Sequence, residues 1–188
     1  MTLFPGLLGV ALPGADPWLA TDKGDLRCRQ LADRHYTRQT PGSPHWTRPG
    51  YSAVLHASAA RGEALFVWWR PKWEAGIERK DGLRAIECTH FRREGRPLDG
   101  GGLPLASDLI RAAVVALDLG PVRAALRLDV AGPILDGLIS GVGSAATTAQ
   151  RSPRSPPGAC FGHAGWTRIG RSGSRADVWW QLEWRATA

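Results

Sequence analysis

The sequence predicts a single mixed α/β (α+β) domain, with a central sheet flanked by helices. Strand-like segments, in which apolar and polar residues alternate, lie on both sides of a segment whose apolar residues follow helical spacing. The chain of 188 residues is long enough to bury a sizeable core, and it contains no internal repeat. We therefore expect residues 1–188 to form one domain, in which residues 1–20 are an N-terminal extension without clear secondary structure.

The expected order of elements starts with a helix. Asp22 can cap a helix that runs to about Arg34. The segment "TPGSPHWTRPG" follows as a loop, because its prolines and glycines interrupt regular structure. Residues 51–58 and 63–71 then read as two strands joined by the turn "AARG", which predicts a hairpin.

A strand and a helix form the centre of the chain. Residues 83–94 alternate as a strand, and the helix after it has Ser107 as its expected N-cap and Gly120 at its end. The two faces expected for the strand are Ile86, Cys88 and His90 on one side and Glu87, Thr89 and Phe91 on the other. The apolar stripe of the helix consists of Leu109, Ile110, Ala113, Val114 and Leu117.

The last third of the chain is less regular. Residues 122–130 are a strand candidate, residues 132–144 a short helix, and residues 143–157 a flexible loop of low complexity. A short helix over 158–166 and two strands, over 167–172 and 177–185, complete the order. One face of the final strand would carry Val178, Trp180, Leu182 and Trp184.

Composition points to a cytoplasmic protein with a polyanionic partner. The net charge is +7, and positive charge favours nucleic acid because each neutralised phosphate releases counterions. A merely basic surface is the alternative. The three cysteines are widely spaced and form no zinc pattern, which fits a reducing compartment. No stretch is apolar enough to span a membrane; the oligomeric state is open.

Two local motifs resemble the GNAT acyltransferases. "ACFGHAGWTRIGRS" is similar to the family's C-terminal helix, glycine-aromatic pair and strand, and "FRREG" stands where the family has its pyrophosphate-binding loop. The resemblance implies a GNAT-like fold and an acyl-CoA-type donor as a small-molecule partner. Glycine-rich backbone and a helix N-terminus suit such an anion. The residues that would hold the donor are Arg92, Arg93, Gly95 and Ser107.

Four stretches together resemble the Mom-type proteins of phages and mobile elements, a GNAT-like branch that modifies the exocyclic amine of adenine in DNA. They are "RHYTRQTPG", "ECTHFRREG", "SDLIRAAV" and "PGACFGHAGW". The family's His-Tyr motif is matched by His35-Tyr36-Thr37, and Leu128-Asp129 corresponds to a Val-Asp pair at the end of a strand. The resemblance thus implies His35, Tyr36 and Asp129 as catalytic residues, and as ligands of a transition metal such as iron.

Chemistry on the adenine amine also requires contacts with DNA. A histidine can accept a proton near neutral pH. The adenine must leave the duplex before an enzyme can reach its amine. We expect Arg38, His45, Trp46 and Arg96 to contact nucleic acid, and His90 on the central strand is a further candidate for substrate contact.

Other interpretations remain open. His35-Tyr36 can simply end a helix, with the histidine at the C-terminal dipole and the tyrosine on the core. The chain can also be an acetyl-CoA-dependent N-acetyltransferase of a small amine. A third alternative is a catalytically inactive domain that only binds nucleic acid or protein, since residues 131–157 depart from the family's pattern.

Overall fold

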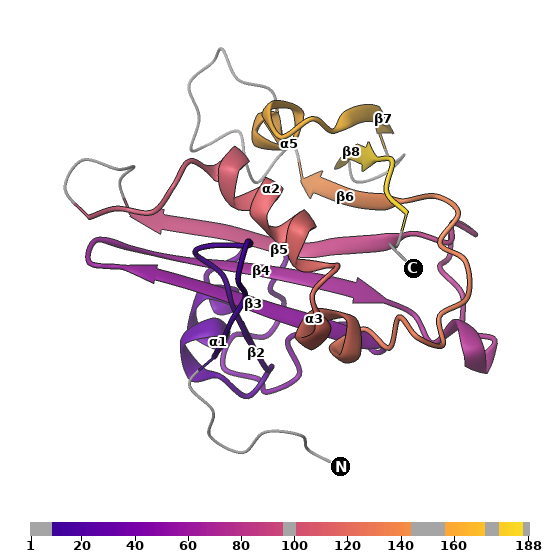
Figure 1. The fold of residues 1–188 in the computed structure, drawn as a ribbon, viewed down its shortest axis with the longest axis horizontal. Helices are drawn as coiled ribbons and strands as arrows, with labels where there is room; N and C mark the ends of the chain where they lie inside the picture. Colours follow the sequence, from indigo (N-terminus) through magenta and orange to yellow (C-terminus); the bar gives the residue numbers. More distant parts are fainter. Residues whose placement is uncertain (1–8, 96–100, 144–156, 172–176, 186–188) are drawn as a thin grey trace.

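The fold is built on one eight-stranded mixed sheet (Figure 1). The computed structural model describes residues 9–95, 101–143, 157–171 and 177–185. Neighbouring strands follow the order β1-β2-β3-β4-β5-β6-β8-β7, and every pair is antiparallel except β5 and β6. The strands are β1 (Val10–Ala11), β2 (Leu19–Thr21), β3 (Tyr51–Ala59), β4 (Gly62–Arg70), β5 (Ile86–Gly95), β6 (Leu138–Gly143), β7 (Thr167–Arg171) and β8 (Asp177–Leu182).

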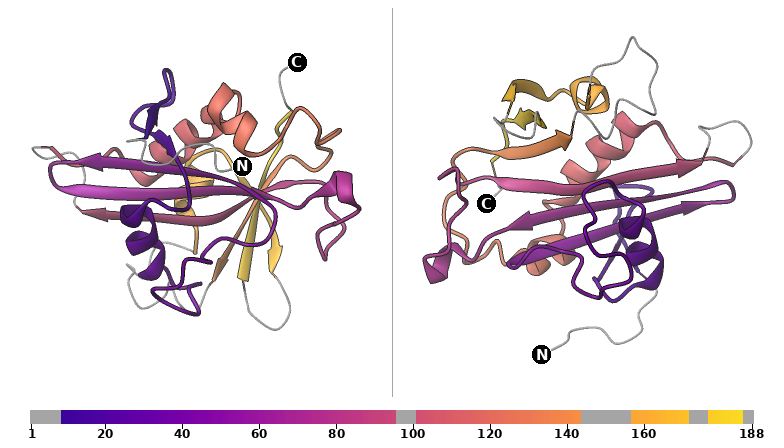
Figure 2. Two further views of the ribbon diagram at one scale, coloured as in Figure 1. Left: turned by 90° about the horizontal axis from the view of Figure 1, so that it is seen from below. Right: turned by 180° about the vertical axis from the view of Figure 1, so that it is seen from behind.

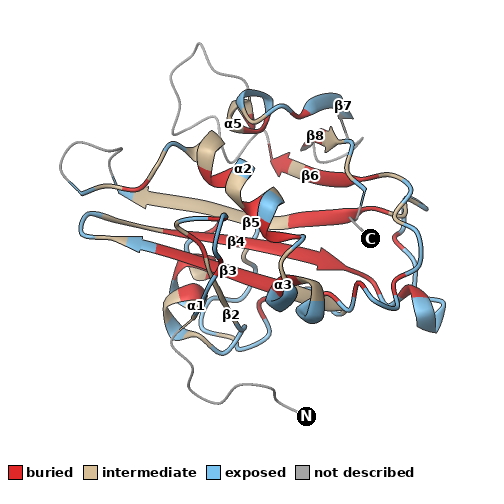
Figure 3. Ribbon diagram, in the orientation of Figure 1, coloured by how far each residue is buried: buried red, intermediate tan, exposed pale blue. Residues whose placement is uncertain are grey.

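Helices cover both faces of the sheet (Figure 2, left). They are α1 (Leu26–Asp33), η1 (Trp73–Ala75), α2 (Ala106–Ala116), α3 (Gly120–Ala125) and α5 (Ala159–His163). The α2 face holds the main hydrophobic core, where Phe66 and Trp68 of β4 meet Ile110 of α2. The α1 face holds a smaller cluster that includes Leu31 and Val67. β3, β4 and β6 are consequently buried over most of their length, whereas β5 is buried mainly in its first half (Figure 3). No helix in the described ranges is long and apolar enough to cross a membrane.

The expected hairpin and the two C-terminal strands are confirmed. β3 and β4 pair from Tyr51↔Arg70 to Ala59↔Gly62. In β8, Val178 and Trp180 are buried in the main core, and Leu182 and Trp184 pack against it, as the alternation predicts. The short helix α5 also forms where it was expected. In these segments the local sequence pattern and the tertiary contacts favour the same secondary structure.

Several expected boundaries shift, and two segments change type. Asp25, not Asp22, caps α1, and its side chain accepts a hydrogen bond from the backbone N–H of Arg27. α2 starts at Ala106, so Ser107 lies in its first turn, while Gly120 starts α3 rather than ending α2. The strand expected at 122–130 is wrong, because proline near the start and two alanines favour the helix α3. The helix expected at 132–144 is wrong too, because its apolar residues form β6.

Part of the expected N-terminal extension belongs to the domain. β1 and β2 add two short strands to the edge of the sheet, and Leu12 and Trp18 are buried in the main core. The indole Nε1 of Trp18 donates a hydrogen bond to the carbonyl of Leu109 at 2.8 Å, which ties this segment to α2. The two short strands were not predicted, because glycines and prolines interrupt the strand pattern in this part of the sequence. Residues 1–8, like most of the expected flexible loop (144–156), lie outside the described ranges.

A β-bulge at Thr89 reverses the expected face of two residues. Val67 pairs with His90 and Trp68 pairs with Cys88, so Thr89 has no partner on β4. Beyond the bulge the alternation is inverted: His90 lies on the α1 face, and Phe91 packs into the α2 core. The expectation that His90 shares a face with Ile86 and Cys88 is therefore wrong.

The parallel strands β5 and β6 pair only near their starts. Their register runs from Ile86↔Leu138 to Cys88↔Ser140, and in the described residues it stops where the bulge begins. The later part of β6, Gly141–Gly143, continues to pair with β8 on its other side. Within the described ranges, no residue of β5 after Cys88 pairs with β6, so the two strands separate at this level. This opening is where the candidate site lies.

Candidate functional site

A cleft on the α1 face adjoins the opening between β5 and β6. Its volume is about 700 Å³. The walls come from the loop after α1, from β5 with its bulge, and from β6 and β8. The lining residues are Tyr36, Thr37, Arg38, Gln39, Thr40, Ser43, His45, Trp46, Thr47, Arg48, Glu87, Thr89, His90, Gly141, Gly143 and Trp179. The cleft therefore joins the His-Tyr segment to the central strand.

His35 is held in place and kept neutral. Its Nδ1 accepts hydrogen bonds from the Thr37 hydroxyl at 2.8 Å and from the Thr37 backbone N–H at 3.3 Å, which places its proton on Nε2. Burial, with smaller contributions from the neighbouring His90 and Arg92, lowers the pKa of His35 to about 3. A ring whose lone pair already accepts two hydrogen bonds is neither a free base nor a free metal ligand. The geometry supports the helix-end interpretation of His35.

Tyr36 occupies the open edge of β6. Its hydroxyl accepts a hydrogen bond from the backbone N–H of Gly143 at 3.0 Å, and it lies 3.4 Å from the carbonyl oxygen of Gly141, to which it donates. These two backbone groups point to the edge that β5 leaves. A Cβ at Gly143 would come within 2.7 Å of the Tyr36 ring, so a larger residue there would displace the ring from this position. Tyr36 thus replaces a strand partner, while its ring remains partly exposed in the cleft.

His90 lines the cleft, although its side chain is largely buried. The bulge turns its side chain to this face, between His35 at 5.1 Å and Trp46 at 5.8 Å between ring centroids. Its Nδ1 lies 3.2 Å from the Thr89 hydroxyl, whereas Nε2 has no hydrogen bond to any described residue. Burial lowers the pKa of His90 to about 4, and the positive charges of Arg48 and Arg38 act in the same direction. His90 is therefore neutral at neutral pH, and its Nε2 can accept a proton in the tautomer whose Nδ1–H donates to the Thr89 hydroxyl.

Three of the four residues expected to contact nucleic acid line the cleft, but the side chains of two of them are held by hydrogen bonds within the fold. Arg38 donates to Asp33 at 2.7 Å and to the carbonyl of Ser43 at 2.6 Å, which folds the loop back on α1. Trp46 is buried, and its Nε1 donates to the carbonyl of Lys23 at 2.8 Å, so its ring is an anchor and not a free stacking surface. His45 is exposed at the cleft. Arg96 lies outside the described residues.

Asp129 does not join His35 and Tyr36. It lies in an exposed turn after α3, and the neighbouring Leu128 packs in the core of the α2 face, whereas the cleft opens on the α1 face. The expected strand that would have carried it to the cleft is a helix and a turn. Within the described ranges no cluster of three histidine, cysteine or acidic side chains has the geometry to hold a metal ion. The residues expected to bind iron therefore do not fit a metal site.

The residues expected to hold a donor phosphate contact other parts of the fold instead. Arg92 and Arg93 are consecutive in β5 and point to opposite faces of the sheet. Arg93 donates to the carbonyls of Pro104, Leu103 and Gly95 at 2.9, 3.0 and 3.1 Å. Arg92 donates to Glu94 and to the carbonyl of Arg34.

The glycine and the serine of this expected site also have structural places. A Cβ at Gly95 would meet the carbonyl oxygen of Arg61 at 2.1 Å, so this glycine serves the close approach of β4 and β5. Ser107 is half-buried in the first turn of α2, and no hydrogen bond of its side chain is found among the described residues. Together with the arginines, they do not form a common anion site.

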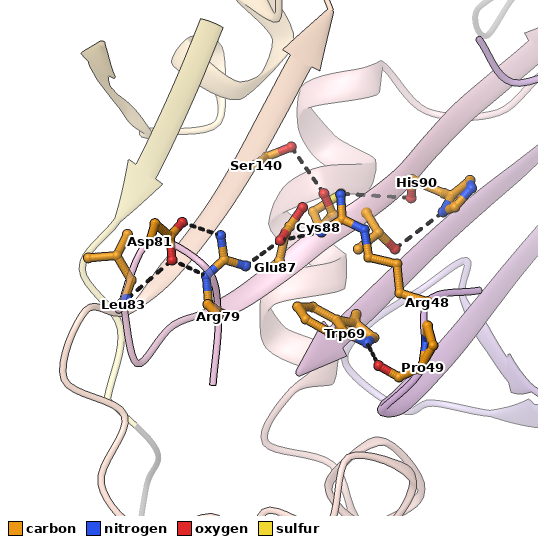
Figure 4. Close-up of polar contacts among 11 residues, drawn as sticks. Arg48, Pro49, Trp69, Arg79, Asp81, Leu83, Glu87, Cys88, His90 and Ser140 are labelled. Atoms are coloured by element: carbon orange, nitrogen blue, oxygen red, sulfur yellow. Dashed lines mark hydrogen bonds and ion pairs between the residues drawn. The ribbon is translucent and has the colours of Figure 1, made fainter. Parts of the chain in front are cut away.

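An ion-pair network centred on the buried Glu87 and Arg79 lies beside the cleft and was not expected from the sequence (Figure 4). Glu87 is 2% exposed, and its Oε2 accepts a hydrogen bond from Arg48 Nη1 at 2.8 Å and another from Arg79 Nη1. Arg79 also forms a bidentate pair with Asp81, through Nε at 2.9 Å and Nη2 at 2.6 Å. The pairing of Arg48 with Glu87 joins residues far apart in the chain, so no local pattern could reveal it.

Trp179 provides the far wall of the cleft. A Cβ at Gly141 would lie 3.0 Å from its ring, so the indole packs directly on the β6 backbone.

Comparison of the chain with known protein families, characterised proteins and solved structures gave no match. No family is assigned. The function must be argued from the site.

Proposed function

We propose that the chain is a GNAT-like enzyme that modifies the exocyclic amine of adenine in DNA, with His90 as the residue that accepts the amine proton. One observation carries the proposal. The segment that resembles the Mom-type His-Tyr motif and the central strand that carries His90 line the same cleft, although they are far apart in the sequence. The sequence resemblance did not depend on this proximity.

The cleft suits a single planar base. Its volume of about 700 Å³ leaves room for one nucleotide and not for a duplex. Tyr36 and Trp179 provide aromatic surface on one side, and a base extruded from the helix commonly stacks against such rings. The net charge of +7 favours a polyanion such as DNA.

The chemistry asked of His90 is limited. When the amine nitrogen forms its new bond, the bond between the transferred group and its donor breaks and the electron pair leaves with the donor. The nitrogen becomes cationic and must lose a proton. A neutral imidazole is enough to accept the proton of so strong an acid, and His90 Nε2 is the available ring nitrogen. We derive no step through an iron centre or through a donor bound at "FRREG", because the residues expected to hold these groups do not converge.

A non-catalytic role is the second candidate, and specific contacts favour it. His35 is bonded to Thr37, and Asp129 lies away from the cleft, so two of the three residues implied by the resemblance are not available for catalysis. A domain that only binds nucleic acid would retain the same cleft and charge. The small-amine acetyltransferase would instead bind acetyl-CoA and have no affinity for DNA.

Mass spectrometry of nucleosides separates these alternatives. DNA from cells that express the protein should contain an adenine derivative that is absent from cells with the empty vector. Unmodified adenine alone, at good expression of folded protein, would contradict the enzyme proposal. If the purified protein then still binds DNA, the non-catalytic role stands; if it binds only acetyl-CoA, the small-amine enzyme stands.

A further inference from the structure

Arg48 lines the cleft, and contacts with Trp69 and Glu87 orient its guanidinium while leaving some of its N–H donors unused by the described residues. Its guanidinium lies over the ring of Trp69, 5.4 Å from the centroid, and its Nη1 donates to Glu87 at 2.8 Å. Half of its side chain is exposed, at 52%. Among the described residues, Nε and Nη2 have no hydrogen-bond partner.

The backbone around Arg48 is fixed at both ends. Before it, Trp46 is buried and bonded to Lys23. After it, the carbonyl of Pro49 accepts a hydrogen bond from Trp69 Nε1 at 3.0 Å. Gly50 has φ +139°, and a Cβ there would lie 2.5 Å from the carbonyl oxygen of Arg70, so the chain can approach β4 only with glycine. The segment "HWTRPG" thus presents one arginine from a rigid loop.

Glu87 does not depend on Arg48 for charge compensation. Arg79, which is buried, already pairs with the same oxygen of Glu87. Arg48 is therefore the outer member of this network. Its hydrogen bond to the Glu87 carboxylate fixes the direction in which the remaining N–H groups of its guanidinium point. A planar guanidinium that is oriented beforehand loses less freedom when it binds a second oxyanion, and phosphate oxygens match its geometry.

We propose that Arg48 binds a phosphate of the nucleotide whose base enters the cleft beside His90. The inference rests on the proposed function for the identity of the ligand, but the phosphate contact can be tested without any catalysis. Arg48 and His90 line the same cleft, and the positive charge of Arg48 acts to lower the pKa of His90. A phosphate held by Arg48 would place the attached nucleoside next to His90.

The test compares deoxyadenosine 5′-monophosphate with deoxyadenosine by isothermal titration calorimetry at low salt. The wild-type protein should bind the monophosphate about tenfold more tightly, because a charge-assisted contact of this kind contributes about that factor. Arg48→Gln should lose this advantage. Arg48→Lys keeps the charge without the fork and should retain only part of it. Arg61→Gln, which removes the same charge from the exposed β3–β4 turn, should retain all of it.

Further ligands identify the source of the phosphate. Inorganic phosphate that binds as well as the nucleotide, and is lost in Arg48→Gln, would support the anion contact but contradict a nucleobase site. Coenzyme A that depends on Arg48 while the nucleotide does not would overturn the inference. An equal effect of Arg48→Gln and Arg61→Gln, or no advantage of the monophosphate in the wild type, would overturn it as well. Thermal unfolding of each variant checks that the fold is kept.

Discussion

The imidazole rings of His35 and His90 lie against each other, with 5.1 Å between their centroids and 49° between their planes. Both rings are 7% exposed, so neither charge can be solvated well. The pKa of His35 falls to about 3 and that of His90 to about 4, mainly through burial. The pair is thus neutral in the folded state, and protonation of either ring opposes folding.

The first prediction concerns stability in acid. Both pKa values lie below the ordinary value of 6.5, so the unfolded chain binds more protons than the folded chain between pH 6.5 and about 4. The free energy of unfolding should be highest above pH 6.5 and fall steadily as the pH decreases through this range. Urea unfolding at pH 7, 6 and 5 measures this slope, and His90→Gln should make it shallower. A free energy that stays constant from pH 7 to pH 5 would show that these rings are not buried as described.

Tyr36 should protect one backbone amide of β6. Tyr36→Phe removes the hydroxyl that accepts from the Gly143 N–H, so exchange of this amide with solvent should become faster. The loss of stability should be about 1 kcal/mol, the usual contribution of one hydrogen bond. The amide of Val142 points to β8 and serves as the control, since its exchange should change less. Equal acceleration of both amides would indicate general opening of the strand instead.

Arg93 should matter for stability and not for donor binding. Arg93→Ala removes three hydrogen bonds to the carbonyls that connect β5 with the start of α2, and should cost about 2–3 kcal/mol in the free energy of unfolding. Denaturant unfolding measures the cost, with Arg61→Ala as a control for loss of one exposed arginine. The resemblance of "FRREG" to the GNAT loop instead implied that Arg93 holds a donor phosphate. Unchanged stability together with weaker binding of coenzyme A would restore that interpretation.

Glu87 should be among the most sensitive charged residues. Glu87→Gln keeps the shape but leaves Arg79 and Arg48 without their common carboxylate, which should destabilise the fold by about 2–4 kcal/mol. Glu63→Gln is the matched control, because Glu63 is 41% exposed and its loss should cost less than about 1 kcal/mol. Similar losses in both variants, measured by urea unfolding, would contradict the buried network.

Local signals account for much of the fold. The hairpin of β3 and β4, the α2 stripe, α5 and the face of β8 follow from alternation and helical spacing, and all were expected. The mixed sheet itself is confirmed in its coarse form. The bulge at Thr89 could not be predicted from alternation. One unpaired residue inverts the faces of the residues after it, and the sequence pattern does not mark which residue is unpaired.

The candidate site was predictable only in part. The loop with Tyr36, Arg38, His45 and Trp46 does line the cleft, as a site at the His-Tyr motif requires. The prediction that Asp129 belongs to the site depended on a strand over 122–130. Pro121 near its start favours the helix α3 there instead. Arg48 and Glu87 meet only through the folding of distant segments.

The central claim is that His90 acts on a base held in this cleft. The most direct measurement is nucleoside mass spectrometry of DNA from cells that express the wild type, His90→Gln or His35→Asn at equal levels of folded protein. We expect an adenine derivative with the wild type, its loss with His90→Gln, and its retention with His35→Asn in proportion to the amount of folded protein. A derivative that persists with His90→Gln, or disappears only with His35→Asn, would contradict the account.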